Sequence, residues 1–154
     1  ISGIAYGLNI DSGSGDDTFS FNQLGYHTSY KMDLNTGAGN DNVTITGPAH
    51  ANINLDEGDD TLTITTGNIT GAIDTGSGND IIDIQTGSAK NINTGSGDDT
   101  VFVKTTAGIV SLGEGNNKLT TEGNVSGTIT AGSGNDIVDI LSASSFGYSS
   151  GKSL

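Results

Sequence analysis

The chain has 154 residues with a formal net charge of −13, 25 Gly, no Cys and no Trp, and only 32% of its residues are hydrophobic. Its five cations are all Lys, so the basic patches that bind nucleic acid or insert into anionic membranes are excluded, and no apolar run reaches the about 18 residues of a membrane helix. This composition suits a disordered chain or a repeat fold better than an ordinary globular core, and periodicity has to decide between them.

Seven copies of a six-residue block follow one another along the chain, and the clearest copies read Thr-Gly-Ser-Gly-Asn-Asp and Thr-Gly-Ser-Gly-Asp-Asp. The blocks span residues 12–17, 36–41, 55–60, 75–80, 94–99, 112–117 and 131–136, so successive copies begin 24, 19, 20, 19, 18 and 19 residues apart. A polar insert from Asn22 to Ser29 explains the longer first interval. Self-similarity at a fixed period is typical of solenoids.

Apolar residues alternate with polar ones on both sides of each block, which predicts two short strands per repeat with one face inward. The position two residues before each block holds Ile10, Leu34, Ile53, Ile73, Ile92, Val110 and Ile129. The two inward positions after each block hold Phe19, Val43, Leu62, Ile82, Val101, Leu119 and Val138, and then Phe21, Ile45, Ile64, Ile84, Val103, Thr121 and Ile140. A second bend without acidic residues is expected around Gly47, Gly67, Gly87, Gly108 and Gly123.

The order strand, plain bend, strand, acidic bend predicts an all-β fold, a right-handed parallel β-solenoid (β-roll) with two sheets and about seven coils of about 19 residues. We expect a single domain over residues 1–154, with repeats over about 8–140 and an irregular tail over 141–154. Because the chain begins with Ile1 and no end cap is evident, we expect it to be part of a longer protein with flanking repeats.

Stacked coils bring the last Asp of each block into one column, formed by Asp17, Asp41, Asp60, Asp80, Asp99 and Asp136, with Asn117 at the sixth position. Carboxylates about 5 Å apart repel each other by about 1 kcal/mol in water and several-fold more at an effective dielectric near 20. A hard divalent cation between neighbouring bends would turn this repulsion into a net attraction, with carboxylates and carbonyls as oxygen ligands. The alternative is that the block is only a favourable turn sequence. Zinc is disfavoured because Cys is absent and His27 and His50 lie outside the column.

The block resembles the RTX, or haemolysin-type, calcium-binding repeats of secreted bacterial proteins, whose nonapeptide is Gly-Gly-x-Gly-x-Asp-x-apolar-x. The match runs from Thr75 to Asp83, and the nineteen-residue spacing is similar to that of very large bacterial surface adhesins. The resemblance implies several Ca²⁺ ions in a row along one side, about one per pair of adjacent acidic bends. The implied ligands are the six Asp carboxylates, Asn117, and carbonyls around Gly13, Gly15, Gly37, Gly39, Gly58, Gly76, Gly78, Gly95, Gly97, Gly113, Gly115, Gly132 and Gly134. In the third block Asp56 stands where the others have Gly.

The expected function is that of a calcium-binding structural or adhesive module, secreted or on the bacterial cell surface, which folds outside the cell when it binds calcium. It is not expected to be an enzyme, since no motif links a nucleophile to either His and the chain has no Arg. One alternative is ice binding by the calcium side, and another is binding or modification of a surface glycan, where aromatic side chains would stack on sugar. The candidate aromatics are Tyr26, Tyr30, Phe146 and Tyr148. A host surface is a further possible partner.

Overall fold

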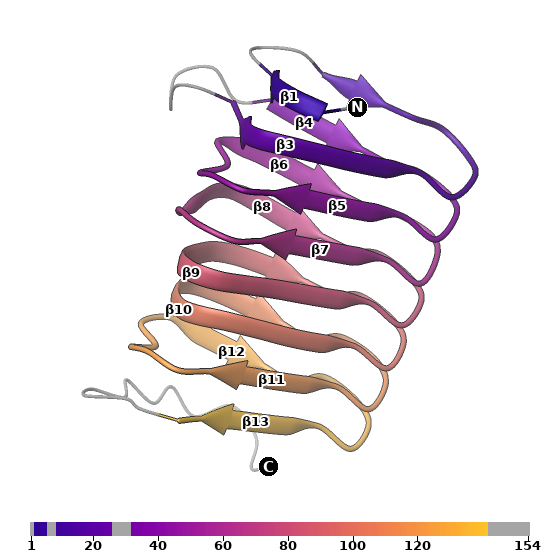
Figure 1. Cartoon of the computed structure of the whole chain (residues 1–154). Coiled ribbons are helices and arrows are strands. Elements are labelled where there is room, and N and C mark those ends of the chain that lie inside the picture. The colour runs from indigo at the N-terminus through magenta and orange to yellow at the C-terminus, as the bar shows by residue number, and fades with distance from the viewer. Residues whose placement is uncertain (1, 6–8, 26–31, 142–154) are drawn as a thin grey trace.

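The chain winds into a parallel β-solenoid of about six turns, with no helix among the described residues (Figure 1). This computed structural model describes residues 2–5, 9–25 and 32–141, without the side chains of residues 2–5, 106 and 107. The predicted tail beyond residue 141, His27 and all four candidate aromatics lie outside the described residues. No helix suited to crossing a membrane occurs in the part of the chain that is described.

Each coil contributes one strand to each of two opposite faces, and all pairs between coils are parallel. The front face in Figure 1 contains β1 (Ser2–Ala5), β3 (Thr18–Leu24), β5 (Asn42–Ile45), β7 (Thr61–Ile64), the first parts of β9 (Ile81–Asn93) and β10 (Thr100–Ser111), β11 (Lys118–Thr121) and β13 (Ile137–Ile140). The rear face contains β2 (Ile10–Asp11), β4 (Met32–Asn35), β6 (Ala51–Asn54), β8 (Ile69–Asp74), the last parts of β9 and β10, and β12 (Thr128–Thr130).

The winding is right-handed, as predicted. In Figure 1 the front strands run from right to left and the rear strands from left to right, while the chain advances from the N-terminal coils at the top to the C-terminal coils at the bottom. This is the hand that crossover connections between parallel strands take almost without exception. Seven acidic bends lie between rear and front strands, so they enclose six complete turns.

The register places equivalent positions of successive repeats directly on one another. On the front face Val43 pairs with Leu62, Leu62 with Ile82, and the series continues in the same register through the last coil. On the rear face Ile53 pairs with Ile73 and Ile73 with Ile92 in the same manner. Side chains of a strand alternate between faces, so this register turns the three apolar positions of each repeat into three inward ladders.

The inward ladders form the core, and the sequence predicted most of them. All are buried from Ile10 to Thr121, whereas Ile129, Val138 and Ile140 in the last coil are only partly buried. The first residue of the acidic block was not among the predicted core positions, yet Thr36, Leu55 and Leu112 are fully buried there. Small side chains also line the interior beside the plain bends. These are Ala49, Ala51 and Ala89.

Three local features differ from the expectation. The plain bends predicted at Gly87 and Gly108 lie inside β9 and β10, because pairing between these two strands continues around the corner and joins the two faces at one edge. The start of the predicted polar insert extends β3, where Leu24 is fully buried. Ahead of the predicted repeats, β1 pairs with β3 and lengthens the front face.

Variation in coil length is confined to the side of the plain bends. From the rear inward position to the final residue of each block the distance is always seven residues, as from Leu34 to Asp41 or from Val110 to Asn117. The two front inward positions always follow that residue by two and four. Where the spacing between successive blocks differs from nineteen residues, the extra or missing residues therefore lie between the front strand and the next rear strand.

Candidate ion-binding site

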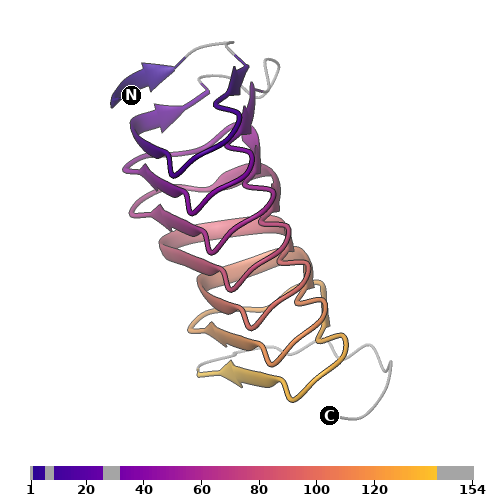
Figure 2. The same ribbon diagram turned by 90° about the vertical axis from the view of Figure 1, so that its right-hand side faces the viewer.

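The acidic bends form a single straight row along one side of the solenoid, which faces the viewer in Figure 2. Their third residues are bridged in parallel from each coil to the next, from Ser14 to Ala38 through to Glu114 and Ser133. The row therefore keeps the same bridging pattern from coil to coil, despite three different residue types at this position.

Left-handed backbone at two positions of each block makes these bends possible. The second and fourth residues have positive φ in all seven copies: Gly13, Gly15, Gly37, Gly39, Asp56, Gly58, Gly76, Gly78, Gly95, Gly97, Gly113, Gly115, Gly132 and Gly134. Asp56 adopts φ 70° and is the one non-Gly residue with positive φ among those described. The third bend thus keeps the geometry of its neighbours, because Asp tolerates this conformation better than most residues do.

Glycine is also required here because the coils approach closely. A Cβ on Gly95 would overlap the carbonyl oxygen of Gly76, whereas a Cβ on Gly13 meets no described atom within 4 Å. The two residues have matching φ values of 88° and 89°. Gly13→Ala is therefore expected to cost only the left-handed penalty of about 1–2 kcal/mol, and Gly95→Ala an additional about 1–3 kcal/mol from overpacking. Thermal unfolding of both variants measures this difference, and equal melting temperatures would contradict the stacking argument.

From Asp41 onward, each residue of the column uses one side-chain oxygen to hold the preceding coil. Oδ1 of Asp41 accepts the backbone N–H of Asp17 at 2.8 Å, and Oδ1 of Asp60 accepts that of Asp41 at 2.8 Å. The same bond recurs at 2.8–2.9 Å from Asp60 to Asp80, Asp80 to Asp99, Asp99 to Asn117 and Asn117 to Asp136. These contacts fix the rotation of every side chain in the column.

The other oxygen, Oδ2, is buried and has no hydrogen-bond partner. This holds for five of the column residues: Asp17, Asp41, Asp60, Asp80 and Asp99. Asp60, Asp80 and Asp99 are each 1% exposed. A buried carboxylate oxygen without a donor carries a large desolvation cost, and carboxylates stacked about 4.8 Å apart repel each other by about 3–4 kcal/mol at an effective dielectric of 20. Five such oxygens in line could be neutralised by bound cations or by protons.

Three of the buried carboxylates, those of Asp60, Asp80 and Asp99, have a pKa above that of free Asp. Desolvation by burial is the largest cause, and it raises the pKa of Asp60 to about 7 and that of Asp99 to about 6. Burial raises the pKa of Asp80 as well, and the nearby Thr75 hydroxyl opposes this shift. Thr75 Oγ1 also donates to the Thr94 carbonyl at 3.1 Å, and Asp80 Oδ2 has no hydrogen-bond partner.

Asn117 identifies the groups that surround the second side-chain atom of the column. Its Oδ1 accepts from Asp99 as an Asp would, so its Nδ2 occupies the place of Oδ2. Nδ2 donates to the Leu112 carbonyl at 2.9 Å and lies 3.5 Å from the Gly115 carbonyl oxygen. These are the first and fourth residues of the same block. In the Asp bends, the equivalent carbonyls face a carboxylate oxygen, so three oxygens converge.

The carbonyls of the predicted glycines fall into two groups. The second-position carbonyls accept backbone N–H groups from the third residue of the next coil, as when Ala38 donates to Gly13 at 2.9 Å and Ser96 to Gly76 at 3.0 Å. The fourth-position carbonyls accept none of the backbone hydrogen bonds that the structure describes. Their members are Gly15, Gly39, Gly58, Gly78, Gly97, Gly115 and Gly134. They are the oxygens best placed to act as ligands together with Oδ2. The first-position carbonyls of Thr36, Leu55, Thr94 and Leu112 each accept a hydroxyl hydrogen bond, and those of Thr36, Leu55 and Thr94 have one lone pair left for an ion.

A second ladder runs along the exposed side of the same bends, at the fifth block position. Its members alternate in charge over most of the row: Asp16, Asn40, Asp59, Asn79, Asp98, Asn116 and Asn135. Here Oδ1 accepts the backbone N–H of the following coil, for example from Asn40 to Asp16 at 2.8 Å. The two ladders therefore clamp each bend from both directions.

The site is made of oxygen ligands alone. No group of three or more His, Asp or Glu side chains converges in the described residues, so backbone carbonyls have to supply most of any coordination shell. His50 lies elsewhere, with Nδ1 3.0 Å from the Thr70 hydroxyl. One carboxylate oxygen with several carbonyls is a donor set for a hard cation such as Ca²⁺, and it lacks the nitrogen and sulfur ligands that Zn²⁺ prefers.

No family model, no curated protein and no solved structure matches this chain. Its class therefore rests on the fold and the site. It is a nineteen-residue-repeat parallel β-solenoid with a stacked ladder of buried aspartates that could bind ions.

Proposed function

We propose that the chain is a calcium-binding structural module of a secreted or cell-surface bacterial protein, of the RTX type that its repeats resemble. The observation that carries the proposal is the row of five buried carboxylate oxygens without a donor. Ca²⁺ accepts six to eight oxygen ligands in flexible geometry, including carbonyls, whereas Mg²⁺ demands strict octahedral geometry and gives up water reluctantly. A site formed mainly by rigid backbone carbonyls therefore favours calcium.

Calcium would be part of the folded structure and not a catalytic group. Asp60 and its equivalents would hold the ion through Oδ2, and the ion would supply the positive charge that stacked carboxylates need. The role proposed for the module is to extend or display other parts of the protein, with host surfaces or flanking repeats as partners. Folding on calcium outside the cell fits this role, because metal binding and folding are then one process.

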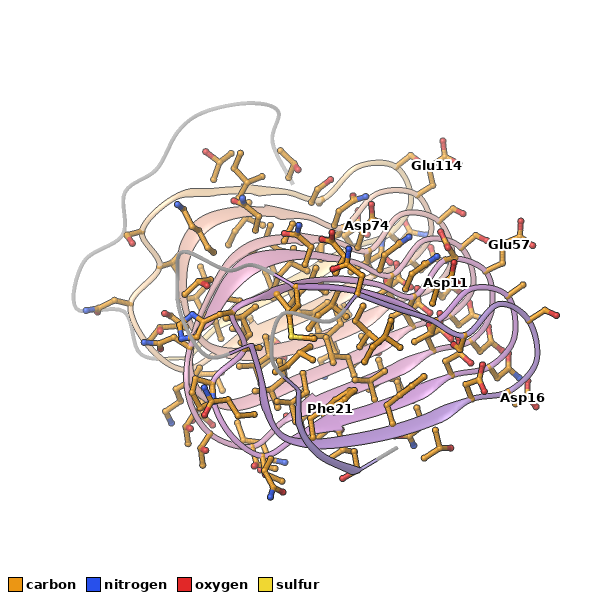
Figure 3. The ribbon with its side chains drawn as sticks, turned by 90° about the horizontal axis from the view of Figure 1, so that it is seen from above. Asp11, Asp16, Phe21, Glu57, Asp74 and Glu114 are labelled. Carbon is orange, nitrogen blue, oxygen red and sulfur yellow. The ribbon has the colours of Figure 1, made fainter. Side chains whose placement is uncertain are left out.

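The outer side of the acidic bends argues for this role over ice binding. Among residues at the third block position, Glu57 and Glu114 project outward from the row (Figure 3), and the fifth position alternates between Asp and Asn. An ice-binding face requires a regular array of one side-chain type, and charged groups interrupt it here. We expect no thermal hysteresis from the purified chain. A glycan array would test carbohydrate binding separately.

Calcium titration of the metal-free chain by calorimetry tests the proposal. We expect cooperative binding of several ions with dissociation constants of about 10⁻⁴ to 10⁻³ M, the range of extracellular modules, because an ion in one bend stabilises the next coil. Magnesium at the same concentration is the control, and we expect little heat from it. Absence of calcium binding, or equal binding of both ions, would refute the proposal.

A further inference from the structure

We infer that Asn117 closes the sixth acidic bend without an ion and divides the ion row into two segments. The inference rests on the proposed function and assigns to one residue the opposite role from its neighbours. From the sequence, Asn117 was expected to ligate calcium through its amide oxygen. The structure gives that oxygen a different partner.

Every polar group of Asn117 is already used. Its Oδ1 accepts the Asp99 N–H at 2.8 Å, its own N–H goes to Asp136 Oδ1 at 2.9 Å, and its Nδ2 donates to the Leu112 carbonyl at 2.9 Å. The residue is 1% exposed. It differs in this respect from the five aspartates whose Oδ2 has no partner.

The amide cannot turn around to offer its oxygen to an ion. Reversal would bring Nδ2 against the Asp99 N–H, leaving two donors facing each other and a buried N–H without an acceptor. The same reversal would remove one of two donors from the Leu112 carbonyl, which also accepts from the Thr94 hydroxyl at 2.9 Å. Both losses are costly in a buried site. The assignment of oxygen and nitrogen is therefore fixed by the backbone donor of Asp99.

The hydrogens of Nδ2 fill the space between the side chain and the carbonyls, which is where an ion bound to an Oδ2 would lie. These hydrogens carry partial positive charge and are directed at the Leu112 carbonyl, with the Gly115 carbonyl within 3.5 Å. An arriving Ca²⁺ would meet these hydrogens and carbonyls that are already satisfied. The sixth bend thus holds its conformation in the absence of calcium, with Asp17 to Asp99 on one side of it and Asp136 on the other.

The test compares Asn117→Asp with Asn116→Asp in the full chain. Asn116 is exposed in the same bend, so its variant adds the same charge without directing an oxygen into the site. We expect N117D to bind at least one more calcium ion per chain than the wild type, counted by calorimetry. In calcium-free buffer N117D is expected to melt at least about 5 °C below the wild type. N116D loses the bond from Nδ2 to Asp98 Oδ1 at 3.1 Å, so it should also melt lower, by less than N117D, but its ion count should equal that of the wild type.

Asp80→Asn provides the converse variant, because it should turn an ion site into a closed bend. We expect it to lose at least one ion and to melt above the wild type in calcium-free buffer. A wild type that binds calcium, with N117D binding the same number of ions, would overturn the role of Asn117 and leave the proposed function standing. A wild type that binds none would overturn both.

A measurement on the wild type covers the case in which N117D does not fold. The side-chain amide hydrogens of Asn117 should exchange slowly with solvent and keep their NMR positions when calcium is added to saturation. Loss of their protection in saturating calcium would mean that an ion displaces the amide, and would overturn the inference.

Discussion

Removal of calcium is expected to lower the melting temperature of the chain by tens of degrees. A ligand at tenfold its dissociation constant stabilises the native state by about 1.4 kcal/mol per site. Five sites, one for each unpartnered Oδ2, add about 7 kcal/mol, which is comparable with the whole stability of an ordinary domain. For a chain of this length 1 kcal/mol corresponds to about 2–4 °C.

Circular dichroism during heating checks this expectation in about 10 mM calcium, in about 10 mM magnesium and in calcium-free buffer. We expect the calcium-free chain to lose its β signal at or near room temperature, because stacked carboxylates then repel without compensation. Asp60→Asn and Asp80→Asn should each narrow the gap between the two melting temperatures. Identical curves with and without calcium would restore the interpretation that the block is only a turn sequence.

Acidification is expected to stabilise the calcium-free chain, which is the reverse of ordinary acid denaturation. Folding raises the pKa of Asp60 from 3.8 to about 7, so the folded state binds protons more tightly than the unfolded state between these values. Stability is then greatest below the unfolded value and is lost as the pH rises through about 7. The raised pKa of Asp99, about 6, contributes in the same direction.

Calcium should invert this dependence, since protons and calcium compete for the same oxygens. Melting at about pH 5 and about pH 7.5, in resin-treated buffer with and without calcium, separates the two cases without a chelator whose affinity itself changes with pH. We expect acid to raise the melting temperature in the calcium-free buffer and to lower it in the buffer that contains calcium. Asp60→Asn should weaken both trends. A calcium-free chain that melts lower at acid pH would contradict the burial of these carboxylates.

Periodicity alone was enough to predict the solenoid, because every coil of a solenoid repeats the same strands and bends. The alternation around Leu62 and Ile64 specifies a strand with one face inward, and its recurrence in register specifies the stacking. Conformation at the plain bends was less predictable. Gly87 lies inside β9, where pairing with β10 stops at Ile84 and resumes at Ser88 across a register shift.

The aspartate column was predicted, but the different hydrogen bonding of its two carboxylate oxygens was not. Sequence spacing brings Asp60 above Asp41, yet only the three-dimensional structure reveals that Oδ1 is taken by a backbone N–H and that Oδ2 is left alone. The same holds for Asn117, whose amide orientation depends on a donor from another coil. The sequence did contain a signal that the first block position is buried. Leu55 and Leu112 stand where other copies have Thr, and Leu at this position indicates an inward side chain.

The confinement of length variation to the plain bends has a mechanical consequence. The edge that carries the acidic bends has the same contour in every turn and is clamped in both directions, so it forms a stiff spine that resists stretching along the axis. The opposite edge gains five residues in the first interval and loses one in the fifth without altering that spine. The side of the plain bends can therefore accept inserted peptide between one turn and the next without disturbing the contour of the acidic edge.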